Sequence, residues 1–153
     1  MTKTNELTAA AEFLSRKFPH GGRVLCAVSG GLDSMCLLDY MTRQPGFSVA
    51  AAHFNHGLRG SEADRDEEFV RDYCAKRRIP FVSGSGDTRL LAEKEDLSIE
   101  EAARRLRYEF LNKAAEDGGY DAILTAHHAD DNAETVLLNL VRGTGSAGLA
   151  GIP

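Results

Sequence analysis

The chain has 153 residues, 42% of them hydrophobic and 27% charged, so it is long enough to bury one hydrophobic core. No apolar run approaches the roughly 20 residues of a membrane span, and the first residues lack the order of a secretory signal. The net charge of −5 argues against strong non-specific binding to nucleic acids. Three cysteines without a CxxC pair indicate a reducing compartment, the cytoplasm.

Strand and helix patterns alternate along the chain. Helices are expected where apolar residues recur with the helical period, and strands where short apolar runs are bounded by glycine or proline. The expected elements are a helix over 7–18, a strand over 23–29, a helix over 33–43, a strand over 48–56, a helix over 61–78, a strand over 80–85, a helix from 98 to 116–120, a strand over 121–127 and a helix from 130 or 131. This order predicts an α/β fold with a doubly wound, mostly parallel sheet and helices on both faces.

Two of the expected helices begin with a capping signal. In a capping box, a serine or threonine bonds the backbone three residues later, and an acidic or amide side chain there bonds back. Ser61 with Asp64 occupies such positions, and Ser98 with Glu101 forms a second pair. Both pairs therefore predict where a helix starts.

The segment SGGLDS, at 29–34, carries the clearest chemical signal. It follows a buried strand, and ligands of open parallel sheets collect beyond the carboxyl ends of the strands. Gly30 and Gly31 let a ligand approach the main chain, and the next helix begins with unpaired N–H groups and a partial positive charge. The hydroxyls of Ser29 and Ser34 add donors. Hydrogen bonds to a charged partner contribute about 1.5–3 kcal/mol each, so this turn predicts a polyphosphate site without a lysine.

Asp33 needs a separate explanation, because a carboxylate repels a phosphate. It caps the helix, or it holds a Mg²⁺ ion that bridges it to the phosphates. Capping alone leaves the two glycines and the two serines of the segment unexplained. The magnesium role is therefore the better interpretation.

SGGLDS resembles the S-G-G-x-D-S loop of the N-type ATP pyrophosphatases, the PP-loop superfamily. The resemblance implies an adenine nucleotide alpha hydrolase-like fold and a loop that grips the β and γ phosphates of ATP while chemistry happens at the α phosphorus. The residues that it implies for ATP binding are Ser29, Gly30, Gly31, Leu32, Asp33 and Ser34. Asp33 is also the implied Mg²⁺ ligand and a catalytic residue.

Four further stretches narrow the resemblance. They are HFNHGLRG (53–60), LSIEEAARRLRYEFL (97–111), TAHHADDNAETVLLNLVRGTG (125–145) and GLAGI (148–152). Together with the loop they resemble the N-terminal domain of the bacterial tRNA(Ile)-lysidine synthetases, with Asn132 where glutamine is more usual. The resemblance implies that ATP adenylates the C2 oxygen of the wobble cytidine in a tRNA(Ile) with a CAU anticodon. The amine of free L-lysine then displaces AMP, and codon reading changes from AUG to AUA.

The resemblance also suggests site residues outside the loop. His127, with His128 as the lesser candidate, would accept the proton of the lysine amine or face the α phosphate, and Arg107 would contact ATP phosphates or the target base. Asp131 and Glu134 are three apart, so on a helix they would share a face suited to lysine or to a cytidine amino group. Weaker candidates for contact with RNA or ATP are His56, Arg59, His128 and Arg142.

Other functions stay open. A 2-thiocytidine synthetase would need paired cysteines, whereas Cys26, Cys36 and Cys74 fall inside expected elements and suit core packing. An amidotransferase would need a source of ammonia that the sequence does not show. A non-enzymatic nucleotide-binding domain would share the sheet but would not require Asp33.

We expect residues 1–153 to be one N-terminal PP-loop domain of a longer protein whose further domains grip tRNA. On that expectation the chain binds ATP and Mg²⁺ but modifies tRNA poorly by itself. The expected partners are tRNA(Ile) and lysine, with no membrane. A homodimer is left open.

Overall fold

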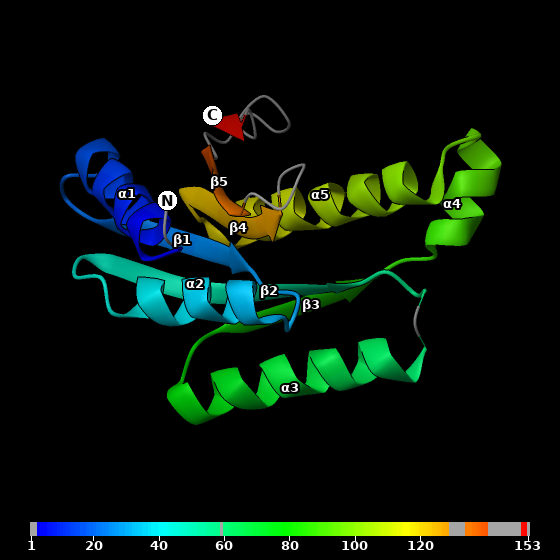
Figure 1. Ribbon diagram of the computed structural model, residues 1–153, viewed down its shortest axis with the longest axis horizontal. Coiled ribbons are helices and arrows are strands. Elements are labelled where there is room, and N and C mark those ends of the chain that lie inside the picture. The colour runs from blue at the N-terminus through cyan, green and yellow to red at the C-terminus, as the bar shows by residue number, and fades with distance from the viewer. Residues whose placement is uncertain (1–2, 59, 129–133, 141–150, 153) are drawn as a thin grey trace.

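Figure 1 shows the computed structural model, in which helices pack against a twisted sheet. The structure describes residues 3–58, 60–128, 134–140 and 151–152. The strands are β1 (Gly22–Ala27), β2 (Phe47–Asn55), β3 (Phe81–Ser85), β4 (Ala122–His128), β5 (Glu134–Leu140) and β6 (Gly151–Ile152). The helices are α1 (Lys3–Lys17), α2 (Leu32–Thr42), α3 (Ser61–Arg77), α4 (Thr88–Glu95) and α5 (Ile99–Gly118).

Within the described residues the strands form one sheet in the order β3-β2-β1-β4-β5-β6. β1 pairs in parallel with both β2 and β4, and β2 pairs in parallel with β3. The prediction of an α/β fold with a mostly parallel sheet is therefore confirmed. The chain leaves β1 toward β2 on one side and later returns to place β4 on the other. The carboxyl ends of β1 and β4 thus flank the switch point where such sheets bind ligands.

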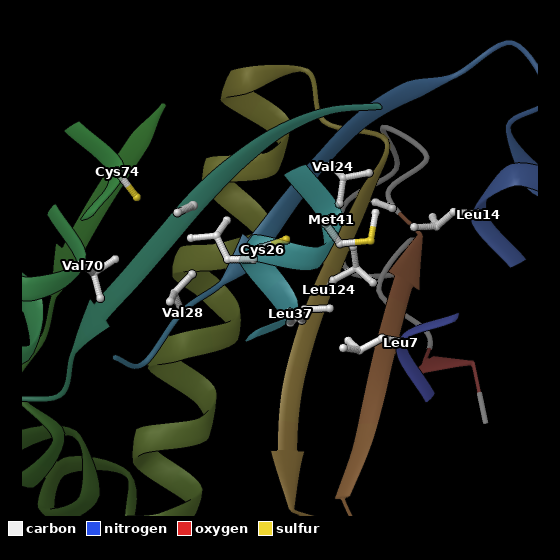
Figure 2. Close-up of a cluster of buried hydrophobic side chains, with 13 residues drawn as sticks. Leu7, Leu14, Val24, Cys26, Val28, Leu37, Met41, Val70, Cys74 and Leu124 are labelled. Atoms are coloured by element: carbon white, nitrogen blue, oxygen red, sulfur yellow. The ribbon is translucent and has the colours of Figure 1, made fainter. Parts of the chain in front are cut away.

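One face of the sheet is covered by α1, α2 and α3. Figure 2 shows the buried side chains between them, with Leu37 and Met41 of α2 packed toward Cys26 and Leu124 of the strands. The β1 sequence GRVLCA is short and apolar, as expected for a strand buried on both faces. This core holds the carboxyl end of β1, and therefore the turn that follows it, in a fixed place.

The opposite face is covered by α5, which lies across the sheet from α3 (Figure 1). Leu111 and Ala115 of α5 pack on Leu25, Ala52 and Ile123. The long helix thereby extends past the carboxyl edge of the strands and carries polar residues of its first half to that edge.

The helix ends test the two capping predictions. Ser98 accepts a bond from the Glu101 N–H and Glu101 bonds back, so the predicted capping box is confirmed. The prediction for Ser61 is wrong. Gly60 is the N-cap of α3, at φ 55°, with no side-chain cap, and Ser61 is the first helical residue. A glycine adopts this backbone angle without steric cost, which lets the helix start one residue earlier.

Two elements differ from the expected order. α4 was not predicted, although Asp87 caps it by accepting a bond from Leu90 N–H at 3.0 Å. The predicted last helix is wrong over 134–140, which form strand β5, antiparallel to β4. ETVLLNL is a short apolar run with two β-branched residues, and periodicity alone does not separate a strand from a helix in such a run.

In the part of the chain that the structure describes, no helix is both long enough and apolar enough to cross a bilayer.

Candidate functional site

The loop from Ser29 to Ser34 is closed on itself by its two serines. Ser34 Oγ accepts from Ser29 N–H at 3.1 Å, lies 3.2 Å from Ser29 Oγ and donates to Gly31 O at 3.1 Å. Ser29 Oγ accepts from Gly31 N–H at 3.2 Å. These bonds hold the loop at the start of α2, whose first N–H groups have no acceptor within the helix. These N–H groups at the start of α2 are therefore suited to bind an anion.

The two glycines of the loop have different roles. Gly30 has φ +95°, which L side chains rarely adopt, and a Cβ there would lie 3.3 Å from the Cβ of Asp66 in α3. Gly31 is the N-cap of α2 with φ −75°, which any residue can adopt. Conformational freedom is therefore required at Gly30, and α3 packs closely against the loop at that point.

Asp33 lies in the first turn of α2, but it does not cap the helix. The N-cap is Gly31, which has no side-chain cap bond among the described residues. The interpretation of Asp33 as the helix cap is therefore wrong, because Asp33 lies two residues after the N-cap. A carboxylate in the first turn still interacts favourably with the helix dipole.

A cavity of about 320 Å³ opens beside this loop, at the carboxyl edge of the strands. Its floor is formed by the ends of β1, β2 and β4, and its walls by α3 and α5. The polar lining residues are Ser29, Ser34, His53, Asn55, His56, Asp66, Arg107 and Thr125. Ser29 and Ser34 of the loop were predicted from the sequence, as were His56 and Arg107, and the fold brings these four residues to one cavity. The other predicted loop residues, 30–33, are not among the residues that line it.

Buried polar atoms at this cavity include Arg107 Nε and the hydroxyl of Thr125, a residue that is 4% exposed. Neither atom has a hydrogen-bond partner among the described residues. The Arg107 guanidinium lies 5.2 Å from the centre of the Tyr108 ring. Because buried polar groups are nearly always hydrogen-bonded, such atoms at a cavity indicate a polar ligand.

The segment HFNHGLRG contributes the side of the cavity next to β2. His53 is buried and its Nδ1 lies 2.7 Å from Val28 O. Asn55 bonds Asp64 at 3.2 Å and the N–H of Gly57 at 2.9 Å. Thr88 donates to His56 O at 2.8 Å. The segment is therefore fixed by α3, α4 and the neighbouring strand.

Four residues of this site were missed from the sequence: His53, Asn55, Asp66 and Thr125. Three of them, His53, Asn55 and Thr125, lie within the last four residues of a predicted strand, and this place near the carboxyl end was the available signal. Asp66 gave no signal, because only the packing of α3 on Gly30 brings it to the cavity.

The remaining candidates are placed only in part. His127 and His128 end β4 and lie opposite Thr135 and Glu134 in the antiparallel pairing with β5. The expected helical pairing of Asp131 with Glu134 is wrong for Glu134, which begins a strand. Arg59, Asp131 and Arg142 lie outside the described residues.

The donor set fits Mg²⁺ only together with phosphates. The described residues contain no group of three or more metal-ligating side chains. Asp66 of α3 lines the cavity and packs beside Gly30, and Asp33 lies in the first turn of α2. Mg²⁺ is usually bound by one or two carboxylates together with substrate phosphates and waters. Asp66, at the cavity, and Asp33, at the start of α2, would supply carboxylates of this kind.

Two of the three cysteines, Cys26 and Cys74, belong to the core. Burial, and then the neighbouring Cys74 thiol, raises the pKa of Cys26 to about 12. Burial also raises the pKa of Cys74. Both thiols face the cluster between the sheet and its helices (Figure 2). A thiol whose pKa is raised is mostly protonated at neutral pH and reacts slowly.

Comparison with known proteins identifies the family. The family model described as "PP-loop domain" matches residues 3–153. The chain belongs to the PP-loop family. The matched residues include the Ser29–Ser34 segment, which the sequence predicts to be the PP loop.

Curated relatives of this PP-loop chain share one name. A tRNA(Ile)-lysidine synthase of Clostridium tetani is 45% identical over 86% of this chain and 29% of its own length. A tRNA(Ile)-lysidine synthase of Chlorobaculum tepidum is 43% identical over 99% of this chain and 47% of its own length. The chain thus spans less than half of either relative.

Solved structures share the fold of this PP-loop domain. A U34-tRNA thiolase of Methanococcus maripaludis matches 82% of this chain and 47% of its own, with a TM-score of 0.57 and 21% identity. An NH₃-dependent NAD synthetase of Campylobacter jejuni matches 82% of this chain and 56% of its own, with a TM-score of 0.59 and 16% identity. At these identities the likeness concerns the fold alone, an α/β fold of the adenine nucleotide alpha hydrolase type.

Proposed function

We propose that the cavity binds ATP, with the β and γ phosphates on the PP loop and the α phosphate toward Arg107. The observation that carries this proposal is that Ser29 and Ser34 of the loop line the same cavity as Arg107, whose buried Nε has no hydrogen-bond partner among the described residues. Hydrogen-bond donors from the loop and a guanidinium from α5 then converge on one polyphosphate. Arg107 is suited to this, because a guanidinium binds phosphate oxygens in a fixed fork.

The loop would act on the leaving group. When a nucleophile attacks the α phosphorus, the bond to the β phosphate breaks and negative charge grows on the departing pyrophosphate. The amides of the loop, held in place by Ser29 and Ser34, are prearranged donors for this charge. The products of such a reaction are a transferred AMP group and pyrophosphate.

Asp33 and Asp66 would hold Mg²⁺ on the phosphates. The ion would neutralise phosphate charge and orient the triphosphate when bound. Asp33 contributes its carboxylate from the first turn of α2 and Asp66 from α3, across Gly30. A bound Mg²⁺ ion would explain why two acidic residues lie near a site for a negatively charged ligand.

The substrates of the proposed reaction are a tRNA(Ile) with a CAU anticodon and free lysine. The proposal is supported by the curated relatives named tRNA(Ile)-lysidine synthase, which match at 45% and 43% identity. The C2 oxygen of the wobble cytidine attacks the α phosphorus, and the lysine amine then displaces AMP from C2. His127 is proposed to accept the amine proton, and Glu134 and Asp131 to hold the amino acid. His56, His128, Arg59 and Arg142 remain candidates for RNA or ATP contact.

Thiolation is a less suitable reaction for this chain. Sulfur transfer through the protein would use accessible thiolates, whereas Cys26 and Cys74 are buried and their pKa values are raised. Cys36 in α2 is half-buried and is not among the residues that line the cavity.

A chimera tests the proposed function. Residues 3–153 replace the matched segment of the Clostridium tetani relative, which supplies the rest of its length. With α-labelled ATP, lysine and tRNA(Ile) bearing a CAU anticodon, we expect labelled AMP and lysidine, and neither with a UAU anticodon. Labelled ADP, or a folded chimera that forms no lysidine, would contradict the proposal.

A further inference from the structure

A buried histidine lies directly behind the PP loop. His53 of β2 is 4% exposed, and its Nδ1 lies 2.7 Å from the carbonyl oxygen of Val28. A carbonyl oxygen only accepts hydrogen bonds, so Nδ1 carries the proton and donates it. Val28 is the last residue before Ser29, where the loop begins.

The bond lies where β1 and β2 separate. Their parallel pairing ends at Ala27 and Ala52, and one more backbone bond follows, from Val28 N–H to Ala52 O at 2.8 Å. β2 continues beside β3 as far as Asn55. In a continued parallel ladder the next donor to Val28 O would be a backbone N–H of β2. Among the described residues the imidazole of His53 supplies this donor instead.

We propose that His53 is a positioning residue of the PP loop. Its Nδ1–H fixes the Val28 carbonyl, and with it the direction in which Ser29 leaves the sheet. The side chain of Val28 is itself buried in the core next to Cys26 (Figure 2). Ser29 N–H in turn bonds Ser34 Oγ at 3.1 Å, so a rotated Val28–Ser29 peptide would open the loop.

The same ring also lines the cavity, so Nε2 offers a second way to act, by touching the ligand. The two nitrogens can be separated by substitution. The amide nitrogen of asparagine is as many bonds from Cα as Nδ1, and that of glutamine as many as Nε2. His53→Asn therefore keeps the donor to Val28, His53→Gln keeps a group near Nε2, and His53→Leu removes both.

The test is calorimetric titration of ATP with MgCl₂ into the 153-residue chain and its variants. It rests on the proposed function only in taking ATP as the ligand of the loop. We expect His53→Asn to stay within about threefold of wild-type affinity and His53→Gln and His53→Leu to lose at least about tenfold. Equal affinity of all three variants to each other, or retention by His53→Gln alone, overturns the positioning role.

A second measurement does not depend on ATP binding. The imidazole ¹⁵N spectrum of the wild-type chain should show the proton on Nδ1, and a proton on Nε2 alone overturns the inference. The amide signals of Ser29 and Gly30 should shift in His53→Leu and His53→Gln but not in His53→Asn. If the wild-type chain fails to bind ATP, the proposed function is wrong, while these spectra still decide the role of His53.

Discussion

The hydroxyl oxygens of Ser29 and Ser34 lie 3.2 Å apart, so the two ends of the PP loop are joined through their side chains. Ser34 is 3% exposed and also bonds Ser29 N–H and Gly31 O. Backbone groups that would otherwise vary in direction are fixed by one buried side chain. A ligand therefore meets a loop that is already ordered.

Ser34→Ala removes these bonds and should loosen the loop. At about 0.5–1.5 kcal/mol for each of the three hydrogen bonds, we expect the free energy of unfolding to fall by about 1.5–4.5 kcal/mol. ATP affinity should fall by about tenfold, because the amides lose their common orientation. Urea unfolding and calorimetry measure the two effects. The control is Ser15→Ala, at an exposed helical serine of α1, which should change neither the stability nor the ATP affinity. Wild-type ATP affinity in Ser34→Ala would contradict the loop's dependence on Ser34.

Neighbouring glycines should respond differently to alanine. Gly30→Ala places a Cβ at φ +95° and against Asp66, and such a backbone strain costs about 1–3 kcal/mol. Gly31→Ala introduces a Cβ at φ −75° with its nearest contact, Ser29 Oγ, at 3.4 Å, so stability should change by less than about 0.5 kcal/mol. Thermal melting followed by circular dichroism measures both. Equal losses would show that the loop backbone does not have this conformation.

Asp33→Asn tests the magnesium role without disturbing the fold, because Gly31 rather than Asp33 is the N-cap of α2. We expect ATP affinity in MgCl₂ to fall at least about tenfold, to the value that the wild-type chain shows in EDTA. Melting temperature should change little. Asp72→Asn, an exposed aspartate of α3, is the matched control. An Asp33→Asn variant that still responds to MgCl₂ as the wild type does would remove Asp33 from the metal site.

Arg107→Lys should weaken ATP binding although it keeps the positive charge. The substitution removes Nε, the buried donor without a partner among the described residues, and it removes the planar fork. We expect about a tenfold loss in affinity. Arg104→Lys is a sharp control, because Arg104 contacts the same Tyr108 ring from an exposed position. If both variants bind ATP alike, the charge of α5 matters and the Nε donor does not.

Stability should decline at alkaline pH. The folded-state pKa of Cys26 is about 12, above the ordinary 9.0, so between these values the unfolded chain loses a proton that the folded chain keeps. The contribution is therefore complete below pH 9 and is lost as pH rises toward 12, by at most about 1.4 kcal/mol per pH unit for one proton. Burial raises the pKa values of Cys74 and Tyr73 in the same direction. In Cys26→Ala the free energy of unfolding, measured with urea from pH 8 to 10.5, should decline less steeply than in the wild type. An unchanged slope would contradict this role of Cys26.

The sequence predicted the elements that local signals define. β1 to β4 and the helices α1, α2, α3 and α5 follow from apolar runs, helical periodicity and the Ser98–Glu101 box. Where two structures satisfy the same local pattern, prediction fails. ETVLLNL suits a helix or a strand, and its pairing with β4 decides the outcome.

For the site, the loop and Arg107 came from motifs, but the cavity came from tertiary packing. Asp66 lies far from the loop in the sequence, and its place is set by the position of α3 over Gly30. His53 belongs to the HFNHGLRG segment, yet its bond to Val28 depends on how β1 and β2 separate. Such relations between elements are not encoded in the spacing of residues.

The most direct test of the account is the position of the triphosphate on the protein. Crystals of the chain soaked with ATP and MgCl₂ should show β and γ phosphate oxygens within about 3.2 Å of backbone nitrogens of the PP loop, with the α phosphate toward Arg107. A triphosphate bound elsewhere on the protein would contradict the account. So would a triphosphate whose γ phosphate, and not its α phosphate, is accessible to an attacking group from the opening of the cavity.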